Sequence, residues 1–430
     1  MRFIPTYIVS QQAEARKAHR PREGRHKRPA PENPRQYKYV KILRVILHTI
    51  GGWPGEALGE HVPFIIKFIR KYCCAQAVAL FVGQMYYLYE KNEVLDFLTK
   101  GHCYITCALC VTTIIRTSIL SFKKYGEIVK TFIMTFNLGH HQHKGEYYKQ
   151  MHMTIYKISH YFTLYSVIMM LFGMWLFNLT SVYENIRNGA FSRNRGPDTK
   201  LELTIYFSYP GFDPLARFNF VTILNLYLAY NCGIAICVLD LFLSLMAFQI
   251  IGHILILRNN FKILPKPAQI MFDAEENENV HKKIVECVQY HREIVSFAEE
   301  LSSFFGPVLG FNYAFQLVSL CLLLLESSHG HQALVRFGPM TFIIFGQLIT
   351  LSVTFEVIGT VSEKLKDSVY DIEWECMDTR NRRIVCILLH RVQTPLHVTA
   401  MGLTPVGVTT MAAILRTTFS YFAFLRSMSE

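Results

Sequence analysis

Charged residues are scarce in this sequence. Asp, Glu, Lys and Arg make up 18% of the 430 residues, while hydrophobic residues make up 51%. An ordinary soluble domain carries about 25% charged residues, so this chain has more apolar surface than one globular core needs. Windows of about twenty mostly apolar residues, the length that crosses a bilayer, recur along the chain. The composition therefore argues against a soluble protein and predicts an all-α membrane protein with several spans.

Motifs for catalysis are missing as well. The sequence contains no Gly-rich phosphate loop, no Gly-x-Ser-x-Gly elbow and no His-Glu-x-x-His pair. We therefore expect no enzymatic activity and no cofactor. The cluster His140, His141 and His143 lacks an accompanying cysteine or carboxylate pair, so we interpret it as a solvated loop and not as a metal site.

Cysteines are absent from the two longer loops between apolar runs, residues 181–214 and 327–336. A disulfide framework in those loops is therefore excluded. Cys103, Cys107 and Cys110 recur at helical spacing within an apolar run. We expect them to be small buried packing residues.

Seven apolar stretches predict seven transmembrane helices. They are residues 62–89, 95–121, 154–180, 215–258, 303–326, 337–362 and 405–427. The fourth stretch is longer than a membrane is thick, so we expect its later part to continue as a cytoplasmic helix.

Positive charge predicts the orientation of these spans. Residues 11–35 are basic and rich in proline, without the apolar core of a secretory signal, so we expect the N-terminus in the cytosol. The segments that are then cytoplasmic hold 28 Lys and Arg, and the outer segments hold 7. This asymmetry is the one that membrane insertion favours, and seven spans place the C-terminus outside. The net charge of +12 then follows from topology, and no nucleic-acid partner is expected.

The polar segments divide the chain into two parts. Residues 1–36 predict a disordered basic tail, and residues 37–430 form the seven-helix domain. Amphipathic runs at 41–54, 280–301 and 380–393 predict three further helices on the cytoplasmic side. The first suits the inner membrane surface, the second a solvated helix with one buried face, and the third anionic lipid or a neighbouring subunit.

One face of the seventh predicted span has a regular composition. Ala413, Thr417, Ser420, Phe424 and Met428 are three or four residues apart, with small or hydroxylated residues first and bulky ones last. Four copies of such a helix around an axis would form a wettable lumen closed by an apolar ring, and apolar constrictions gate channels by dewetting. The same face also suits packing on a neighbouring helix.

Several short motifs in the second half of the chain stand in the order typical of one receptor family. They are Ser362-Glu363 with Leu365 and Tyr370, Trp374, Gln393-Thr394-Pro395-Leu396, and Ser420-Tyr421-Phe422 with Leu425-Arg426. Together they resemble the signature of the insect odorant receptors. The resemblance covers most of the chain from Lys41 onward and is most specific between Lys282 and Met428.

This resemblance implies a ligand-selective odorant receptor subunit in the plasma membrane. Such subunits assemble with a shared odorant co-receptor into a heterotetrameric, nonselective cation channel that small volatile odorants open. The co-receptor itself is not expected, because its long cytoplasmic insertion has no counterpart in residues 259–302. In this family the seventh helix lines the pore, so the resemblance assigns pore or gate roles to Thr417, Ser420, Phe424 and Met428.

The resemblance also places an odorant pocket in the outer half of the helix bundle. The second, third, fourth and sixth predicted spans hold many aromatic and methionine residues there, which suit volatile apolar ligands although each also suits ordinary helix packing. The candidate ligand-binding residues are Phe97, Tyr104, Met169, Met170, Gly173, Trp175, Phe177, Phe220, Leu224, Tyr227, Phe342 and Phe345.

Charged residues inside apolar spans need partners, because each costs about 2.5 to 3.5 kcal/mol on insertion scales. The four cases are Arg116, Asp240, Glu356 and Arg416. We expect Arg416 to point into the protein and pair with a carboxylate, since a cation in the lumen would oppose cation flow. The sequon at Asn178 lies at the predicted outer end of the third span and is a candidate glycosylation site.

Other receptor classes fit the sequence less well. The sister family of gustatory receptors typically ends in a Thr-Tyr pair and then a Gln-Phe pair, where this chain has Ser420-Tyr421 and Arg426-Ser427. A G-protein-coupled chemoreceptor would have the opposite orientation. The cysteine-free 181–214 loop and the lack of an Asp-Arg-Tyr motif after the third span also count against it.

Overall fold

The computed structural model describes residues 33–192, 199, 201–212, 214–328 and 330–429, and the side chains at 97, 98, 331, 332, 335, 336, 339, 428 and 429 lie outside this description. The predicted disordered tail falls on undescribed residues as far as residue 32. Its last residues are described: Pro34–Gln36, which the sequence prediction assigned to the tail, form a short 3-10 helix capped by the Asn33 side chain.

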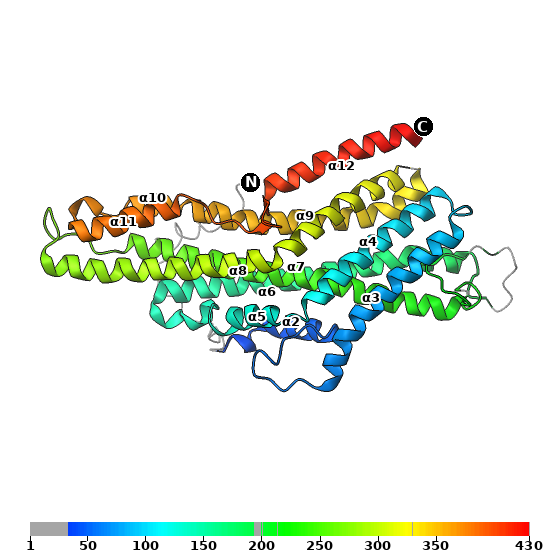
Figure 1. Ribbon diagram of the computed structural model, residues 1–430, viewed down its shortest axis with the longest axis horizontal. Helices are drawn as coiled ribbons and strands as arrows, with labels where there is room; N and C mark the ends of the chain where they lie inside the picture. Colours follow the sequence, from blue (N-terminus) through cyan, green and yellow to red (C-terminus); the bar gives the residue numbers. More distant parts are fainter. Residues whose placement is uncertain (1–32, 193–198, 200, 213, 329, 430) are drawn as a thin grey trace, which may run out of the picture. The chain divides into compact units, whose positions relative to one another are not determined.

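The described chain is almost entirely helical, as predicted. In order, its elements are the 3-10 helix η1 (Pro34–Gln36), α2 (Lys38–Thr49), α3 (Phe64–Lys91), α4 (Phe97–Ile119), α5 (Lys123–Met134), η2 (Leu138–His140), η3 (Gln142–Lys144), α6 (Glu146–Arg187), α7 (Phe218–Lys262), α8 (Ala274–Ser327), α9 (His331–Glu363), α10 (Leu365–Tyr370), η4 (Trp374–Cys376), α11 (Thr379–Val392), β1 (Thr399–Ala400), β2 (Thr404–Pro405) and α12 (Val408–Ser429) (Figure 1).

Among the described residues, six helices are long and apolar enough to cross a membrane: α4, α6, α7, α8, α9 and α12. The first predicted span corresponds to α3, which is not among these six helices and whose first half carries the charged residues Lys67, Arg70 and Lys71. Large apolar side chains nevertheless stay exposed along α3, among them Phe64, Phe68 and Val82. Such a surface fits lipid and not water.

Two of these helices extend well beyond a bilayer. The 45 residues of α7 span about 68 Å at 1.5 Å per residue, so the predicted continuation of the fourth span beyond a membrane thickness is confirmed. In α8, the predicted run 280–301 and the fifth span are one helix of 54 residues. A capping box between Asp273 and Glu276 starts α8, because each side chain accepts a hydrogen bond from the other residue's backbone N–H.

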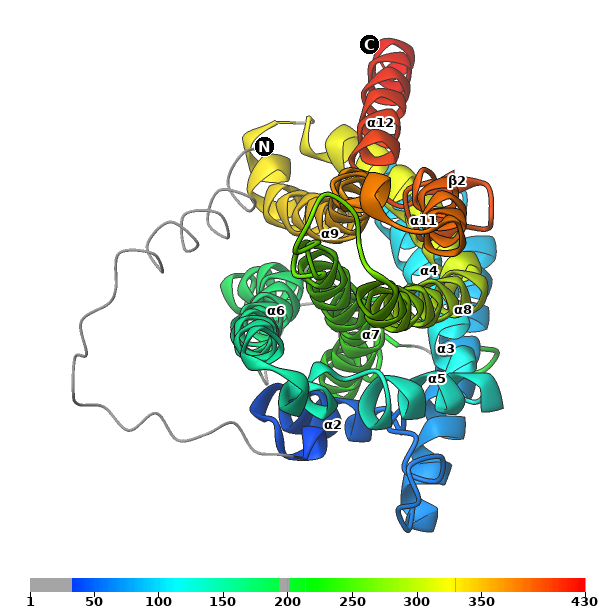
Figure 2. The same ribbon diagram turned by 90° about the vertical axis from the view of Figure 1, so that its left-hand side faces the viewer.

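The core of the described chain forms around α7. This helix contacts α6, α4, α8 and α9, and Figure 2, which views the helices end-on, shows α7 between α6 and α8. In its most apolar window, 83% of the residues are buried within the chain. Its packing is partly aromatic, since the ring of Phe242 meets those of Tyr125 and Phe132 edge-on at 6.2 and 5.5 Å.

The segment between α11 and α12 is a two-stranded hairpin fixed to α8. Thr399 pairs with Pro405 and Ala400 with Thr404. The N–H of Thr399 donates to Oγ of Ser302 at 2.9 Å, and the N–H of Met401 donates to the carbonyl of Gly306 at 3.0 Å. The hairpin thereby fixes where α12, which follows it, begins relative to α8.

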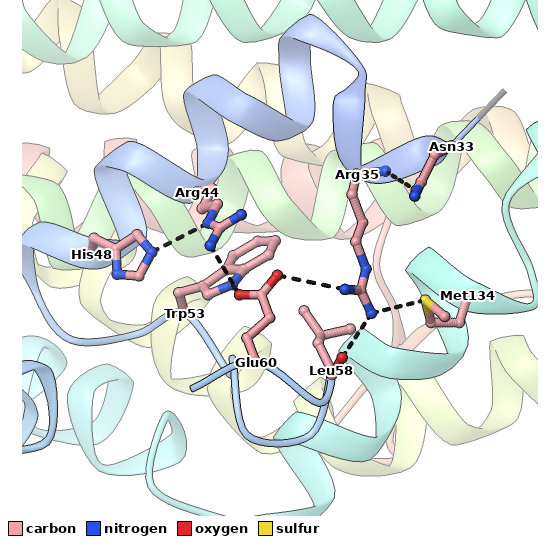
Figure 3. Close-up of polar contacts among 8 residues, drawn as sticks. All are labelled: Asn33, Arg35, Arg44, His48, Trp53, Leu58, Glu60 and Met134. Atoms are coloured by element: carbon pink, nitrogen blue, oxygen red, sulfur yellow. Dashed lines mark hydrogen bonds and ion pairs between the residues drawn. The ribbon is translucent and has the colours of Figure 1, made fainter. Parts of the chain in front are cut away.

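A cluster of charged residues joins the start of the described chain to the loop before α3 (Figure 3). The Glu60 carboxylate accepts hydrogen bonds from Nε1 of Trp53 at 2.9 Å and Nη2 of Arg44 at 3.0 Å, and Nη1 of Arg35 lies 3.7 Å away. The Arg44 guanidinium also lies over the Trp53 ring, 5.5 Å from its centre. Because Arg35 donates to the carbonyl of Leu58 at 2.7 Å as well, this cluster holds the loop against α2.

Candidate ligand cavity and pore helix

A mainly apolar cavity lies among α3, α4, α6, α7, α8 and α9. Its space outside the protein atoms is about 800 Å³, which includes space open to the surroundings. A mainly apolar lining with a few polar groups is typical of small-molecule sites. Its walls are Leu80, Gln84, Thr106, Leu109, Cys110, Met169, Met170, Gly173, Met174, Phe177, Ile205, Ala229, Cys232, Gly233, Ile236, Cys237, Phe315, Met340, Ile343, Ile344 and Gln347.

Four of the twelve candidate ligand residues line this cavity: Met169, Met170, Gly173 and Phe177, all from α6. Two others, Leu224 and Phe345, pack half-buried against neighbouring apolar clusters. The side chain of Phe97 lies outside the described part of the structure. The rest have exposed side chains and line neither this cavity nor the adjoining one: Tyr104, Trp175, Phe220, Tyr227 and Phe342.

The sequence interpretation missed the wall that α3 provides, and in α4, α7 and α9 it named residues other than those that line the cavity. Leu80 and Gln84 from α3 are four residues apart. Met340, Ile343, Ile344 and Gln347 from α9 repeat at three and four residues, which is the spacing of one helix face. This periodicity is visible in the sequence, but it marks every buried face equally, so it could not single out the faces that border a cavity.

A second cavity of about 570 Å³ adjoins the first and is more polar. The two share Met169, Met170, Cys237, Ile343 and Gln347. The second cavity is also lined by Asp240, Ser244 and Thr350. The two cavities are therefore neighbours that border the same parts of α6, α7 and α9.

Asp240 belongs to a buried polar network that links three helices. Nη2 of Arg116 on α4 donates to Oδ1 of Asp240 on α7 at 2.9 Å and to Oδ1 of Asn312 on α8 at 2.8 Å. Nη1 of Arg116 also donates to the carbonyl of Ile236. Arg116 is 2% exposed. The expected need for partners is met here, because the cation of one span neutralises the anion of another.

The predicted pore face lies on the side of α12 that no other part of the described chain covers. In its most apolar window only 11% of the residues of α12 are buried, and Figure 1 shows α12 apart from the other helices along most of its length. Ser420 is exposed, Phe424 is 59% exposed and Thr417 is half-buried. The opposite side packs on α8 and α9 and carries Thr418, which is 1% exposed. The side chain of Met428 is not described.

The expectation for Arg416 was wrong for the single chain. Its side chain is exposed, and none of the ion pairs in the described residues includes it. The reason is geometric: α8 and α9 pack on the side of α12 that holds Thr418, and the Glu356 carboxylate of α9 accepts from the α12 backbone instead.

Glu356 on α9 holds the start of α12. Its Oε2 accepts a hydrogen bond from the N–H of Val408 at 2.9 Å. An anion at this place also interacts favourably with the helix dipole. A side chain at Gly407 would overlap this carboxylate. Glycine at 407 thus allows α9 to approach the first turn of the pore helix.

Asn178 is not placed for glycosylation in this conformation. It lies inside α6, nine residues before that helix ends at Arg187, and it is 8% exposed. Its Nδ2 donates to the carbonyl of Met174 at 2.8 Å. A glycan on this nitrogen would require the amide to leave the helix packing.

The histidine cluster lies in and between η2 and η3 and is partly packed against other elements, so the expectation of a fully solvated loop was wrong. His140 contacts the carbonyl of Ile133 at 3.0 Å through Nε2, and the ring of His141 packs edge-on against His253 at 5.4 Å. Burial lowers the pKa of His141 to about 4, and nearby Lys144 adds to this shift. In the described residues, no group of three or more His, Cys, Asp or Glu side chains is arranged to hold a metal ion.

Comparisons with known proteins agree with this architecture. The family model described as 7tm Odorant receptor matches residues 93–419. Odorant receptor 85c of Drosophila melanogaster is 23% identical over 271 residues, which cover 62% of this chain and 66% of that protein. Odorant receptor 10 of Aedes albopictus is 23% identical over 155 residues, which cover 36% and 41%. The chain thus spans less than two thirds of the length of either relative.

Solved structures extend the likeness over nearly the whole fold. The insect olfactory receptor OR5 from Machilis hrabei superposes with a TM-score of 0.71 at 15% identity, covering 90% of this chain and 97% of that one. The same receptor in complex with eugenol superposes with a TM-score of 0.69 at 14% identity, covering 91% and 98%. At this identity the superposition establishes the fold. Because the family model matches most of the chain, this protein belongs to the seven-transmembrane odorant receptor family.

Proposed function

We propose that this chain is the ligand-selective subunit of an odorant-gated cation channel in the plasma membrane. Small apolar odorants bind in the cavity among α3, α4, α6, α7, α8 and α9. The face of α12 with Thr417, Ser420, Phe424 and Met428 lines a pore shared with three other subunits, among them the odorant co-receptor. The protein to which this chain is structurally similar binds eugenol, which supports a small-molecule ligand here.

The observation that carries this proposal is the uncovered surface of α12. An apolar helix of 22 residues with so little of its surface buried is incomplete in a single chain. Lipid suits Phe419 and Tyr421, which are both 56% exposed. It suits the Ser420 hydroxyl poorly. A water-filled lumen between subunits satisfies this hydroxyl and that of Thr417, while Phe419 and Tyr421 face lipid or protein.

The second support is a continuous path from the cavity to this helix. Met340, Ile343 and Gln347 line the cavity from α9, and Glu356 of the same helix holds the N–H of Val408. A ligand that moves α9 would therefore displace the first turn of α12 through a direct hydrogen bond. Packed helices transmit such shifts because they are stiff.

Whole-cell recording tests the function. Cells that express this chain together with an odorant co-receptor should show odorant-evoked cation currents without added G protein, and cells that express this chain alone should show none. Currents that depend on G-protein signalling, or that never need the co-receptor, contradict the proposal.

A matched pair of variants tests the pore face. Phe424→Ala removes a bulky side chain from the predicted constriction and should raise the current in the absence of odorant several-fold. Phe419→Ala removes the same side chain from another exposed position of α12 and should leave that current unchanged. Equal effects of both substitutions would contradict the assignment of the face.

The orientation is tested by labelling. The excess of Lys and Arg in the segments on one side predicts an extracellular C-terminus. A C-terminal epitope should therefore stain in intact cells. An epitope that stains only after permeabilisation would favour a G-protein-coupled receptor topology.

A further inference from the structure

The apolar cavity contains one buried amide that has no partner. Gln84 on α3 lines the cavity and is 1% exposed. Neither its Oε1 nor its Nε2 has a hydrogen-bond partner among the described residues. Leaving a buried amide unpaired costs about 1 to 3 kcal/mol by protein mutational data. Gln84 therefore destabilises the folded chain unless a molecule from outside the chain forms hydrogen bonds with its amide.

The other polar side chains around the cavity differ from Gln84 in this respect. Oγ1 of Thr106 donates within its own helix to the carbonyls of His102 and Cys103 at 3.1 and 3.0 Å. Nε2 of Gln347 donates to Sγ of Cys237 at 3.3 Å. Gln84 is therefore the amide in this wall whose donor and acceptor both remain available.

The absence of charged side chains among the described residues of the cavity wall limits which ligands can bind to Gln84. None of the described residues that line the cavity is Asp, Glu, Lys, Arg or His. An ionised ligand would lose its hydration without gaining a counter-charge, so it is excluded by its desolvation cost. The ligand is uncharged and mostly apolar, with one polar group.

We propose that Gln84 determines the ligand class of this receptor and selects uncharged hydroxylated compounds, namely alcohols or phenols, over hydrocarbons of the same shape. A carboxamide has an acceptor oxygen and a donor NH₂ group, and a hydroxyl group can donate to the one and accept from the other. An ether accepts only, and an alkane does neither. This inference rests on the proposed function of the cavity as the odorant site.

The test uses the full chain, purified in lipid nanodiscs, with sets of compounds of equal size. Each set contains an alcohol, an ether and a hydrocarbon: octanol, heptyl methyl ether and nonane; cyclohexylmethanol, methoxycyclohexane and ethylcyclohexane; benzyl alcohol, anisole and ethylbenzene. Binding is read as the dose-dependent rise of Tm, which reports occupancy without requiring channel opening.

The expected result is that the alcohol of at least one set binds about three- to tenfold more tightly than its hydrocarbon, the value of one net hydrogen bond. In Gln84→Met, which keeps the length of the side chain, this preference should vanish. Gln84→Met should also raise the Tm of the ligand-free protein, because it removes an unpaired buried amide.

Gln76→Met is the matched control on the same helix. Oε1 of Gln76 accepts from Nδ2 of Asn231 at 3.3 Å, and Gln76 does not line the cavity. This variant should keep the preference for alcohols and should lower the ligand-free Tm, since it breaks a hydrogen bond.

The inference is overturned if no alcohol stabilises the receptor, if the hydrocarbons bind as tightly as the alcohols, or if Gln84→Met keeps the preference. Its failure differs from failure of the proposed function. Odorant-evoked currents that do not distinguish the members of a set would leave the channel assignment intact and remove the role of Gln84. Selective binding of alcohols without any current would support the role of Gln84 and contradict the channel assignment.

Discussion

Helices α7 and α12 are both long enough to span a membrane, yet they differ in almost every other respect. The most apolar window of α7 has a mean hydropathy of 2.4 and is 83% buried, whereas that of α12 has a mean hydropathy of 1.3 and is 11% buried. The helix with the more apolar sequence is the core of the chain. The helix with the mixed sequence is left uncovered.

This difference teaches how one chain prepares for two environments. A helix that is apolar all round is surrounded by other helices of the same chain, and α7 contacts α4, α6, α8 and α9. A helix that has hydroxyl groups on one face and aromatics on another needs two different neighbours. For α12, the neighbours we propose are a pore and either lipid or another subunit.

Phenylalanine substitutions in the two helices should separate them most strongly. Phe242→Ala on α7 removes a ring that is 0% exposed, which should cost about 3 to 5 kcal/mol of unfolding free energy. Phe424→Ala on α12 removes a 59% exposed ring and should cost less than about 1 kcal/mol in the dissociated subunit. Thermal unfolding in detergent measures both. Similar losses would mean that α12 is packed within the subunit.

Substitutions in the buried ion pair of Arg116 and Asp240 should show how strongly α7 is held by its neighbours within the chain. Arg116→Met leaves Asp240 as a buried anion without its cation and should cost about 3 kcal/mol. Arg116→Met combined with Asp240→Leu removes both charges and should recover most of the loss. The unfolding midpoints of the two single variants and the double variant measure this coupling. If the double variant is as unstable as the sum of the two single variants, the network has no energetic coupling.

Much of this fold could be predicted from the sequence. Apolar runs gave the membrane helices, because hydropathy alone decides which segments avoid water. The run at 380–393 was placed as a helix within one residue of α11 at each end. Family motifs near the C-terminus gave the fold and the family, which is one of receptors and not of enzymes. Both predictions depend on the types of neighbouring residues and on their spacing along the chain.

The partners of individual side chains could not be predicted in the same way. Arg116 and Asp240 each clearly needed a counter-charge, but their pairing brings together residues 124 positions apart. Arg416 has the same requirement by composition and remains exposed. Gln84 is indistinguishable in sequence from Gln76, eight residues earlier on the same helix, and only the placement of α6 and α9 makes it a cavity residue. Such facts depend on tertiary contacts that periodicity does not record.

A change of pH should affect the packing of His141 against the second half of α7. His141 packs against His253 of α7 and against Tyr290 of α8, and its pKa falls from 6.5 to about 4 on folding. Because the folded state resists protonation, stability is full above pH 6.5 and is lost as the pH falls toward 4. The contribution is about 1 to 2 kcal/mol after allowance for partial exposure. In His141→Phe, the free energy of unfolding should therefore fall less steeply as the pH is lowered from 6.5 to 4. An unchanged slope would show that His141 is not responsible.

The hydrogen bond between Glu356 of α9 and the first turn of α12 should give the smallest and most local energetic effect. Glu356→Ala removes the acceptor for the N–H of Val408 and should weaken the first turn of α12 by about 1 kcal/mol, the value of a helix cap. Amide exchange there should then become about fivefold faster, while α7 keeps its protection. Glu363→Ala, on the exposed end of the same helix, is the matched control and should leave exchange in α12 unchanged. If Glu356→Ala also leaves it unchanged, the start of α12 is held by the hairpin and not by α9, and the direct route from the ligand cavity to the pore helix is lost.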